Sequence, residues 1–256
     1  MIHHTAVIDP GAELDTDVVI GPYAVIGADV QIGRDTRVGP HAVIKGPSRI
    51  GENNSIYQFA SLGDDPQDKK YQGELTRLEV GNGNVFREYV SVNRGTAQDR
   101  GVTRIGDDNW VMAYAHIAHD CRVGNGTVFA NNASLAGHVT IEDHAVLGGF
   151  TLVHQFCAIG AYAFASFGSV ISKDVPPCVM VSGNPARAHG INTEGLRRHG
   201  FGADRIETVR RAYKLLYRSG LTLEAALQQL RSAAREQPEL AMLVDFLARQ
   251  TRGIVR

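Results

Sequence analysis

Histidines recur along the middle of the chain at intervals suited to a shared site. His138 follows His119 by nineteen positions, His154 follows His138 by sixteen, and His116 precedes His119 by three. Imidazole titrates near neutrality, so a histidine can take a proton from a sugar hydroxyl and return one to a leaving thiolate. No serine elbow or reactive-cysteine context accompanies them, which favours direct transfer over a covalent intermediate. The pattern indicates general acid–base chemistry.

The elements that must position these histidines follow from a six-residue repeat. An apolar residue stands at every sixth position from Ile2 to Leu62, and a second run extends from Ile105 to Ile171 with a weak position at Ala165. Val80, Phe86 and Val92 bridge the two runs. A period of six matches neither the 3.6 of a helix nor the 2 of an ordinary strand. It predicts a parallel β-helix in which three hexads form one coil.

The coil period places the histidines in space. Positions separated by three hexads lie above one another, about 4.8 Å apart, the strand spacing. We therefore expect His119, His138 and His154 near one edge of successive coils, with His116 close by. A residue that only packs would occupy the apolar phase, so the stripe favours a site over ordinary surface or interface histidines. Glycine often follows the apolar residue, as at Gly21, where we expect a tight corner that tolerates little side chain.

Two polar stretches and a change of period organise the rest of the chain. The register breaks near 63–78 and near 93–104, which predicts loops ejected from the prism, with disordered inserts as the alternative. After the Pro176-Pro177 pair the hexads stop and apolar stripes with helical spacing begin. We therefore predict a mainly β protein, with a β-helix over 1–187 and a C-terminal α-helical domain over 188–256.

Composition excludes several classes of protein. The net charge of -1 argues against a nucleic-acid binder. The three cysteines, an odd number without metal-ligand spacing, indicate neither a disulfide framework nor a zinc ribbon, and fit a reducing compartment. The start of the chain lacks a targeting pattern and no apolar run is long enough to span a membrane, so we expect a cytoplasmic protein. The segment from Arg187 onward carries 13 Lys and Arg against 7 Asp and Glu, which suits an acidic partner.

The hexads resemble those of the hexapeptide-repeat transferases, and this resemblance implies a left-handed prism that assembles as a homotrimer. Longer motifs narrow the family over essentially the whole chain. Segments that resemble the UDP-N-acetylglucosamine O-acyltransferases of lipid A biosynthesis lie at 56–61, 67–71, 116–121, 131–132, 136–139, 153–157 and 192–201. The resemblance implies transfer of an (R)-3-hydroxyacyl chain from acyl carrier protein to the 3-hydroxyl of UDP-N-acetylglucosamine, without a cofactor or metal.

The resemblance also assigns roles to individual residues. His119 is expected to be the general base and Asp120 to orient it. His138 and His116 are expected to hold the sugar or stabilise charge at the thioester carbonyl. The remaining substrate-binding residues implied are Asp68 and Lys70 in the first loop, His154 and Gln155 near the sugar and acyl carbonyl, and Asn192, Glu194 and Arg198 at the nucleotide.

Three further expectations concern the acyl donor and the nucleotide. Family members that accept long chains have glycine at the position of Phe167, so a phenyl ring there is expected to shorten the acyl groove. His199 stands where an arginine is common, which argues against a phosphate-binding role at that position. The basic residues expected to face the acidic carrier protein are Arg210, Arg211, Lys214 and Arg218.

Other functions stay open at the level of sequence. A related N-acyltransferase shares hexads and donor, but it has an N-terminal uridine-binding domain, which we do not expect because the hexads begin at Ile2. An acetyl-CoA-dependent sugar acetyltransferase fits the helical tail and the first loop poorly. A β-helical zinc enzyme of the carbonic anhydrase type would use three histidines across a trimer interface. A purely structural β-helix leaves the histidine stripe without a purpose.

Overall fold

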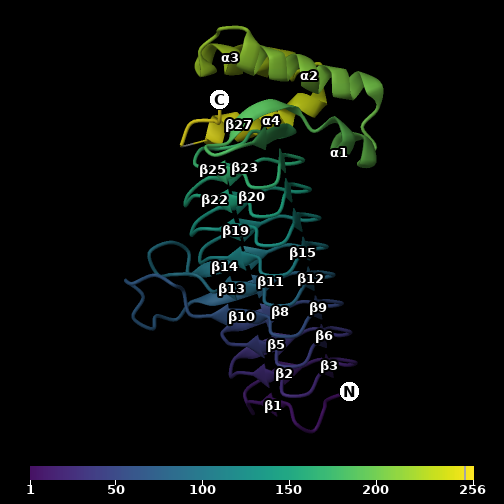
Figure 1. Cartoon of the computed structure of the whole chain (residues 1–256), viewed down its shortest axis with the longest axis vertical. Helices are drawn as coiled ribbons and strands as arrows, with labels where there is room; N and C mark the ends of the chain where they lie inside the picture. The colour runs from purple at the N-terminus through teal and green to yellow at the C-terminus, as the bar shows by residue number, and fades with distance from the viewer. Residues whose placement is uncertain (251) are drawn as a thin grey trace.

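The chain folds into a left-handed parallel β-helix covered at one end by helices, as a computed structural model of residues 1–256 shows (Figure 1). The structure describes residues 1–250 and 252–256. Successive coils are three hexads apart, since Val25 pairs in parallel with Val43 and Ile26 with Ile44. The predicted fold class, with its coils of three hexads, is confirmed.

Three sheets form the faces of the prism. Sheet A contains β3 Val19–Ile20, β6 Arg37–Val38, β9 Ser55–Ile56, β12 Val85–Phe86, β15 Trp110–Val111, β18 Val128–Phe129, β21 Val146–Leu147, β24 Phe164–Ala165, β26 Val179–Ser182 and β27 Arg187–Ile191. Sheet B contains β1 Val7–Ile8, β4 Val25–Ile26, β7 Val43–Ile44, β10 Ser61–Asp64, β13 Ser91–Asn93, β16 His116–Ile117, β19 Ser134–Leu135, β22 Leu152–Val153 and β25 Val170–Ile171. Sheet C contains β2 Glu13–Leu14, β5 Val30–Ile32, β8 Ser48–Ile50, β11 Arg77–Val80, β14 Val102–Ile105, β17 Arg122–Val123, β20 Thr140–Ile141 and β23 Ala158–Ile159.

The apolar residue of each hexad fills the interior of the prism. Ile44, Leu62 and Ile117 have no exposed surface, whereas Ile2, at the open end, is 53% exposed. Burial of apolar surface once in every hexad is the main stabilising term for such a stack. Close approach of the next coil explains the glycine that often follows, because a Cβ atom at Gly21 would lie 2.9 Å from the backbone nitrogen of Pro40.

The two polar stretches leave the prism at the same edge. Ser61 pairs with Ser91, and Ser91 with His116, so each of these coils is longer than three hexads. The extra residues form loops at 65–76 and 94–101, both between sheet B and sheet C, and Figure 1 shows them projecting to one side. We call the corners between these sheets the B–C edge; in the coils above the loops it comprises 118–121, 136–139 and 154–157.

Helices pack on the last coil, as the change of period predicted. They are α1 Thr193–Arg198, α2 Ala203–Arg218, α3 Leu223–Ala233, the 3-10 turn η1 Pro238–Leu240 and α4 Ala241–Arg249. Strand β27 pairs antiparallel with β26 and crosses the predicted domain boundary at residue 187. Residue Val255 returns to the prism, donating its backbone N–H to the Asp174 carbonyl at 2.9 Å. None of the described helices has the length and apolar character needed to cross a bilayer.

Candidate active site

A cavity of about 1260 Å³ lies at the B–C edge, where the two loops meet the coils. Its walls come from three parts of the chain. One wall is formed by the corner residues His119, Asp120, His138, Gln155 and Phe156. A second wall is formed by the two loops, with Gln67, Asp68, Lys69 and Lys70 from the first and Gln98, Asp99 and Arg100 from the second. The lining is completed by Arg122, Thr140 and Arg249.

Residues one coil apart lie above one another at the B–C edge. His119, Gly137 and Gln155 are each one coil apart and occupy the second position of three successive corners. The imidazole of His119 lies over Gly137, where a Cβ atom would come within 2.5 Å of the His119 Cε1 atom. Any larger residue at position 137 would therefore displace the ring.

His119 and Asp120 form a hydrogen-bonded pair at the base of the cavity. The Nδ1 atom of His119 lies 2.9 Å from Oδ2 of Asp120. Asp120 is buried and accepts hydrogen bonds from the Thr96 hydroxyl at 2.7 Å and the Thr96 backbone N–H at 3.0 Å. Burial alone would raise the pKa of the Asp120 carboxyl, but the hydrogen bonds from His119 and Thr96 outweigh it and lower that pKa. The carboxylate therefore stays ionised beside the imidazole.

His138 is held between two carboxylates and an aromatic ring. Its Nδ1 atom lies 3.3 Å from Oδ2 of Asp99, and its Nε2 atom lies 3.9 Å from Oδ2 of Asp120. The ring stacks on Phe156 with centroids 4.5 Å apart and meets His119 edge-on at 5.1 Å. These contacts fix the ring plane, so His138 presents a preformed polar group next to the His119–Asp120 pair.

His116 and His154 lie near the same edge but outside the cavity wall. His116 is on strand β16, and its Nδ1 atom lies 2.8 Å from the Ser91 hydroxyl. Burial, followed by the charge of His119, lowers the pKa of His116 and favours the neutral ring. His154 is exposed and its Nδ1 atom donates to the backbone carbonyl of Gln155 at 3.1 Å. Gln155 itself lines the cavity.

The nucleotide residues implied by resemblance lie at a different edge. Asn192 caps helix α1, accepting from the Gly195 N–H at 3.0 Å, and its amide donates to the Tyr162 carbonyl between sheets C and A. Glu194 and Arg198 form an exposed ion pair at 3.3 Å. None of the three lines the cavity that contains His119. Within one chain, α1 and the His119 cavity are therefore separate.

Phe167 also lies away from His119. It stands at the corner between sheets A and B, with 74% of its surface exposed, and packs edge-to-face with Phe150 at a centroid distance of 5.7 Å. Leu152, on the outward face of sheet B, is 48% exposed and lies between this corner and the B–C edge. Leu152 is thus an exposed apolar residue between the cavity side of sheet B and the Phe167 corner.

The His119, Asp120 and His138 side chains also form the group best placed to hold a metal ion, because one atom from each lies within 4.8 Å of the others. The Nδ1 atom of each histidine and the Asp120 carboxylate already have hydrogen-bond partners within the protein. Asp120 accepts from Thr96 and pairs with His119, and His138 faces Asp99. A zinc site needs all its ligand atoms directed at one point about 2.0–2.2 Å away. Three donor atoms within 4.8 Å of one another do not by themselves meet this requirement.

Several residues of the site were missed from sequence. Thr96 and Asp99 belong to the second loop, whose path no periodicity describes. Phe156 could have been found, because it follows His138 by one full coil, just as His138 follows Asp120. The coil period therefore contained the signal for the third corner position.

Comparisons with known proteins agree with these motifs. A family model described as Udp N-acetylglucosamine O-acyltransferase, domain 2, matches residues 174–255, and a bacterial transferase hexapeptide model matches 103–137. Two similar relatives are both named acyl-(acyl-carrier-protein)–UDP-N-acetylglucosamine O-acyltransferase. The one from Alkalilimnicola ehrlichii is 63% identical to this chain, over 98% of this chain and 97% of the relative. The one from Thiobacillus denitrificans is also 63% identical, over 100% of this chain and 99% of the relative. The structure of LpxA from Acinetobacter baumannii matches with a TM-score of 0.98 and 51% identity, covering 100% of this chain and 99% of that one. The chain is therefore an acyltransferase and belongs to the UDP-N-acetylglucosamine O-acyltransferase family.

Proposed function

We propose that this protein transfers an (R)-3-hydroxyacyl chain from acyl carrier protein to the 3-hydroxyl of UDP-N-acetylglucosamine, the first step of lipid A biosynthesis. Substrates of this kind are in the names of relatives that match the whole chain. The observation that carries the proposal is the His119–Asp120 pair, with Nδ1 and Oδ2 2.9 Å apart, at the wall of a cavity of about 1260 Å³. The three buried free cysteines suit a cytoplasmic location.

His119 acts as the general base. With its Nδ1–H donated to Asp120, the Nε2 atom carries the lone pair. Nε2 takes the proton of the sugar 3-hydroxyl as that oxygen forms a bond to the thioester carbonyl carbon. Asp120 stabilises the resulting imidazolium without taking its proton, as a buried, ionised carboxylate does in a catalytic triad. Collapse of the tetrahedral adduct breaks the C–S bond, and the leaving thiolate takes the proton from His119.

His138 stabilises the charge that develops on the carbonyl oxygen. Its ring is fixed by Asp99 and Phe156, so it presents a donor without reorganisation during the reaction. His116, whose lowered pKa favours the neutral form, contributes a polar contact near the sugar, next to His154 and Gln155. Asp68 and Lys70 of the first loop bind the sugar from the opposite wall.

Direct transfer is supported by the state of the cysteines. Cys121 is the cysteine nearest to His119 in the sequence, and it is fully buried. Burial raises the pKa of the Cys121 thiol to about 12. A thiol with that pKa provides almost no thiolate near neutral pH, so it cannot compete with the substrate hydroxyl as a nucleophile.

A homotrimer is supported by the outward surface of sheet A. Six apolar side chains stand in register on successive strands of this face, namely Val85, Trp110, Val128, Val146, Phe164 and Met180. Trp110 is 44% exposed. The corresponding column of sheet C carries Arg49, Glu79, Arg104 and Arg122, followed by Thr140 and Ala158. A contiguous apolar face of this kind marks a surface that is buried in an assembly.

Assembly also completes the site. Asn192, Glu194 and Arg198 lie at the edge between sheets C and A, away from the His119 cavity of their own chain. In the proposed trimer, helix α1 of a neighbouring copy supplies these residues to the nucleotide. The guanidinium of Arg198 then meets the phosphate oxygens or the uridine, a pairing that its planar donors suit.

The acyl donor is proposed to dock on helix α2. Arg211, Lys214 and Arg218 are exposed on this helix, and Arg210 is half-buried and paired with Glu207. Carrier proteins are acidic, so these charges would steer the donor to the helical end of the prism. The acyl chain would then follow the outward face of sheet B past Leu152 to Phe167.

The proposal is tested by product identification. Purified protein is incubated with UDP-N-acetylglucosamine and 3-hydroxyacyl carrier proteins of short, medium and long chain length, and the nucleotide products are identified by mass spectrometry. We expect one acyl group per sugar, removable by alkaline hydroxylamine because it is an oxygen ester. The nitrogen of this acceptor already carries an acetyl group, so an acylated product would argue against the N-acyltransferase function. No acylated UDP-sugar with any chain would contradict the proposal.

A further inference from the structure

Arg94 is a largely buried arginine that the proposed chemistry does not use. It follows directly after strand β13, at the point where the second loop leaves the B–C edge. Only 12% of its side chain is exposed. Its Nε atom is buried and lacks a hydrogen-bond partner among the described residues. Burying a guanidinium is costly unless it is paired, so its contacts require an explanation.

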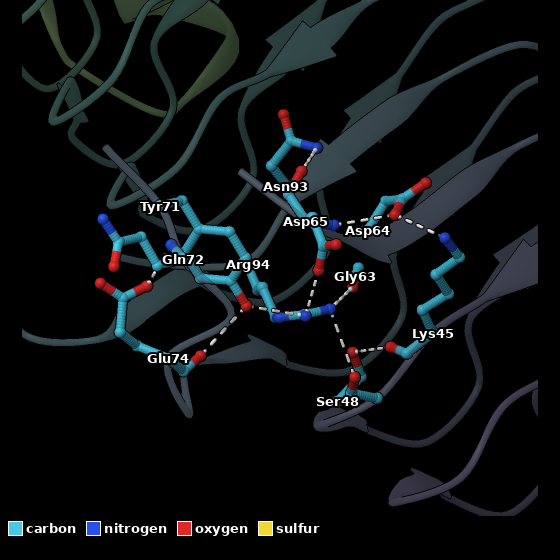
Figure 2. Close-up of polar contacts among 11 residues, drawn as sticks. Lys45, Ser48, Gly63, Asp64, Asp65, Tyr71, Gln72, Glu74, Asn93 and Arg94 are labelled. Atoms are coloured by element: carbon cyan, nitrogen blue, oxygen red, sulfur yellow. Dashed lines mark hydrogen bonds and ion pairs between the residues drawn. The ribbon is translucent and has the colours of Figure 1, made fainter. Parts of the chain in front are cut away.

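The guanidinium of Arg94 binds the first loop (Figure 2). It donates to the Gly63 carbonyl at 2.9 Å and to the Tyr71 hydroxyl at 2.9 Å, and it forms an ion pair with Asp65. A longer hydrogen bond reaches the Gly46 carbonyl at 3.3 Å. One side chain of the second loop thus contacts the first loop at two points, Asp65 and Tyr71.

The two contact points bracket the residues that face the substrate. Asp68 and Lys70 lie between Asp65 and Tyr71, and both line the His119 cavity. The loop between the two points is otherwise held by local bonds, in which Lys70 N–H donates to Asp68 Oδ1 at 3.0 Å and Tyr71 N–H to the Asp68 carbonyl at 3.0 Å. The Tyr71 hydroxyl also donates to the Glu74 carbonyl at 3.0 Å, which links Arg94 to the end of the first loop.

We propose that Arg94 is a positioning residue, which holds the first loop so that Asp68 and Lys70 face His119 across the cavity. This role rests on the proposed function. Lysine cannot replace it, because a single ammonium does not reproduce the planar fork that bonds Gly63, Asp65 and Tyr71 together. A displacement of about 1 Å in a positioning group costs on the order of 100-fold in rate or binding.

The test compares Arg94→Lys with Arg34→Lys. Arg34 forms an exposed ion pair with Glu52 at 2.9 Å, far from the cavity in the chain, and is the matched control. We expect Arg94→Lys to raise the KM for UDP-N-acetylglucosamine by about 10-fold or more. The KM for the acyl carrier protein and the pH profile of kcat should not change, because the His119–Asp120 pair is intact. The control should behave as the unmodified protein.

Tyr71→Phe provides a second variant that leaves no buried charge unpaired. It removes the hydroxyl that links Arg94 to Glu74, and we expect a smaller rise in the same KM, about threefold. In a protein that already carries Asp68→Ala and Lys70→Ala, Arg94→Lys should have little further effect, because the residues it positions are gone. Additive effects in that background would overturn the positioning role.

Limited trypsin digestion separates this inference from the proposed function. Loosening the first loop should speed cleavage after Lys69 and Lys70 in Arg94→Lys but not in Arg34→Lys, whatever the protein acylates. Unchanged cleavage together with an acceptor KM within twofold of the unmodified value would overturn the inference. Loss of all transfer by the unmodified protein would instead contradict the proposed function.

Discussion

The Nδ1 atom of His119 lies 2.9 Å from the Oδ2 atom of Asp120, the next residue in the chain. This contact assigns the proton of the neutral ring to Nδ1 and leaves Nε2 as the basic nitrogen. The carboxylate is ionised because its hydrogen bonds outweigh the effect of burial and lower its pKa. The geometry of the pair thus determines which nitrogen can accept the proton of a substrate hydroxyl.

Thr96 supports this pair from the second loop, so its hydroxyl should matter for the rate. Thr96→Val keeps the shape and the backbone donor but removes the 2.7 Å hydrogen bond to Asp120. Loss of one hydrogen bond to a charged group lowers kcat by about tenfold. Steady-state kinetics should show that change with little effect on either KM. Thr96→Ser, which retains the hydroxyl, is the control, and equal activity in the Val and Ser variants would contradict the role.

Phe167 should limit the length of the acyl chain. Phe167→Gly opens the end of the path that runs past Leu152, so the ratio of kcat/KM for long over medium chains should rise by about tenfold or more. Competition between two carrier proteins with different chains in one reaction measures the ratio directly. Phe150→Leu, at the aromatic partner of Phe167, tests whether the effect is specific to position 167. An unchanged ratio in Phe167→Gly would contradict the role of Phe167 in limiting chain length.

Completion of the site by a neighbouring copy predicts rescue between inactive variants. His119→Ala and Arg198→Ala subunits, unfolded, mixed and refolded together, should regain activity because about a quarter of the shared sites then contain both intact residues. Each variant refolded alone is the control. If both residues act within one chain, the mixture stays as inactive as its parents, and the intersubunit arrangement is wrong.

The half-buried His116 should make stability depend on pH. Burial, then the charge of His119, lowers its pKa in the folded state, so the unfolded chain binds more protons between the folded pKa and the ordinary value. The free energy of unfolding therefore falls as pH falls through this interval. The melting temperature falls between pH 7 and pH 5, and this fall should be about 2 °C smaller in His116→Asn than in the unmodified protein. The asparagine can still form a hydrogen bond with Ser91. An equal fall in melting temperature in the variant and the unmodified protein would contradict this role of His116.

The fold could be predicted because burial repeats at a fixed interval. Every hexad places one apolar side chain inside, as Ile44 and Leu62 do, so the period alone specifies the prism. The same period brought His119 and His138 to adjacent positions of neighbouring corners, since 119 and 137, like 120 and 138, are one coil apart. It placed His154 at the same edge, but it could not show that this side chain lies outside the cavity wall.

The rest of the site lies outside any repeat. Thr96, Asp99 and Arg94 act from a loop whose path depends on contacts with other segments, Arg94 on Tyr71 and Asp99 on His138. Helix α1 docks at the edge between sheets C and A through the Asn192–Tyr162 hydrogen bond, and nothing in the hexad pattern selects that edge. Contacts between non-repeating segments form only in the folded chain, so the hexad period could not predict them.

The rate of acyl transfer to UDP-N-acetylglucosamine in His119→Ala tests the account most directly. The assay follows single-turnover transfer from 3-hydroxyacyl carrier protein with saturating enzyme, so that binding defects do not obscure the chemical step. Removal of the general base should lower the rate by about 100- to 10,000-fold while the protein keeps its fold and its affinity for the sugar. A rate within tenfold of that of the unmodified protein would contradict His119 as the base.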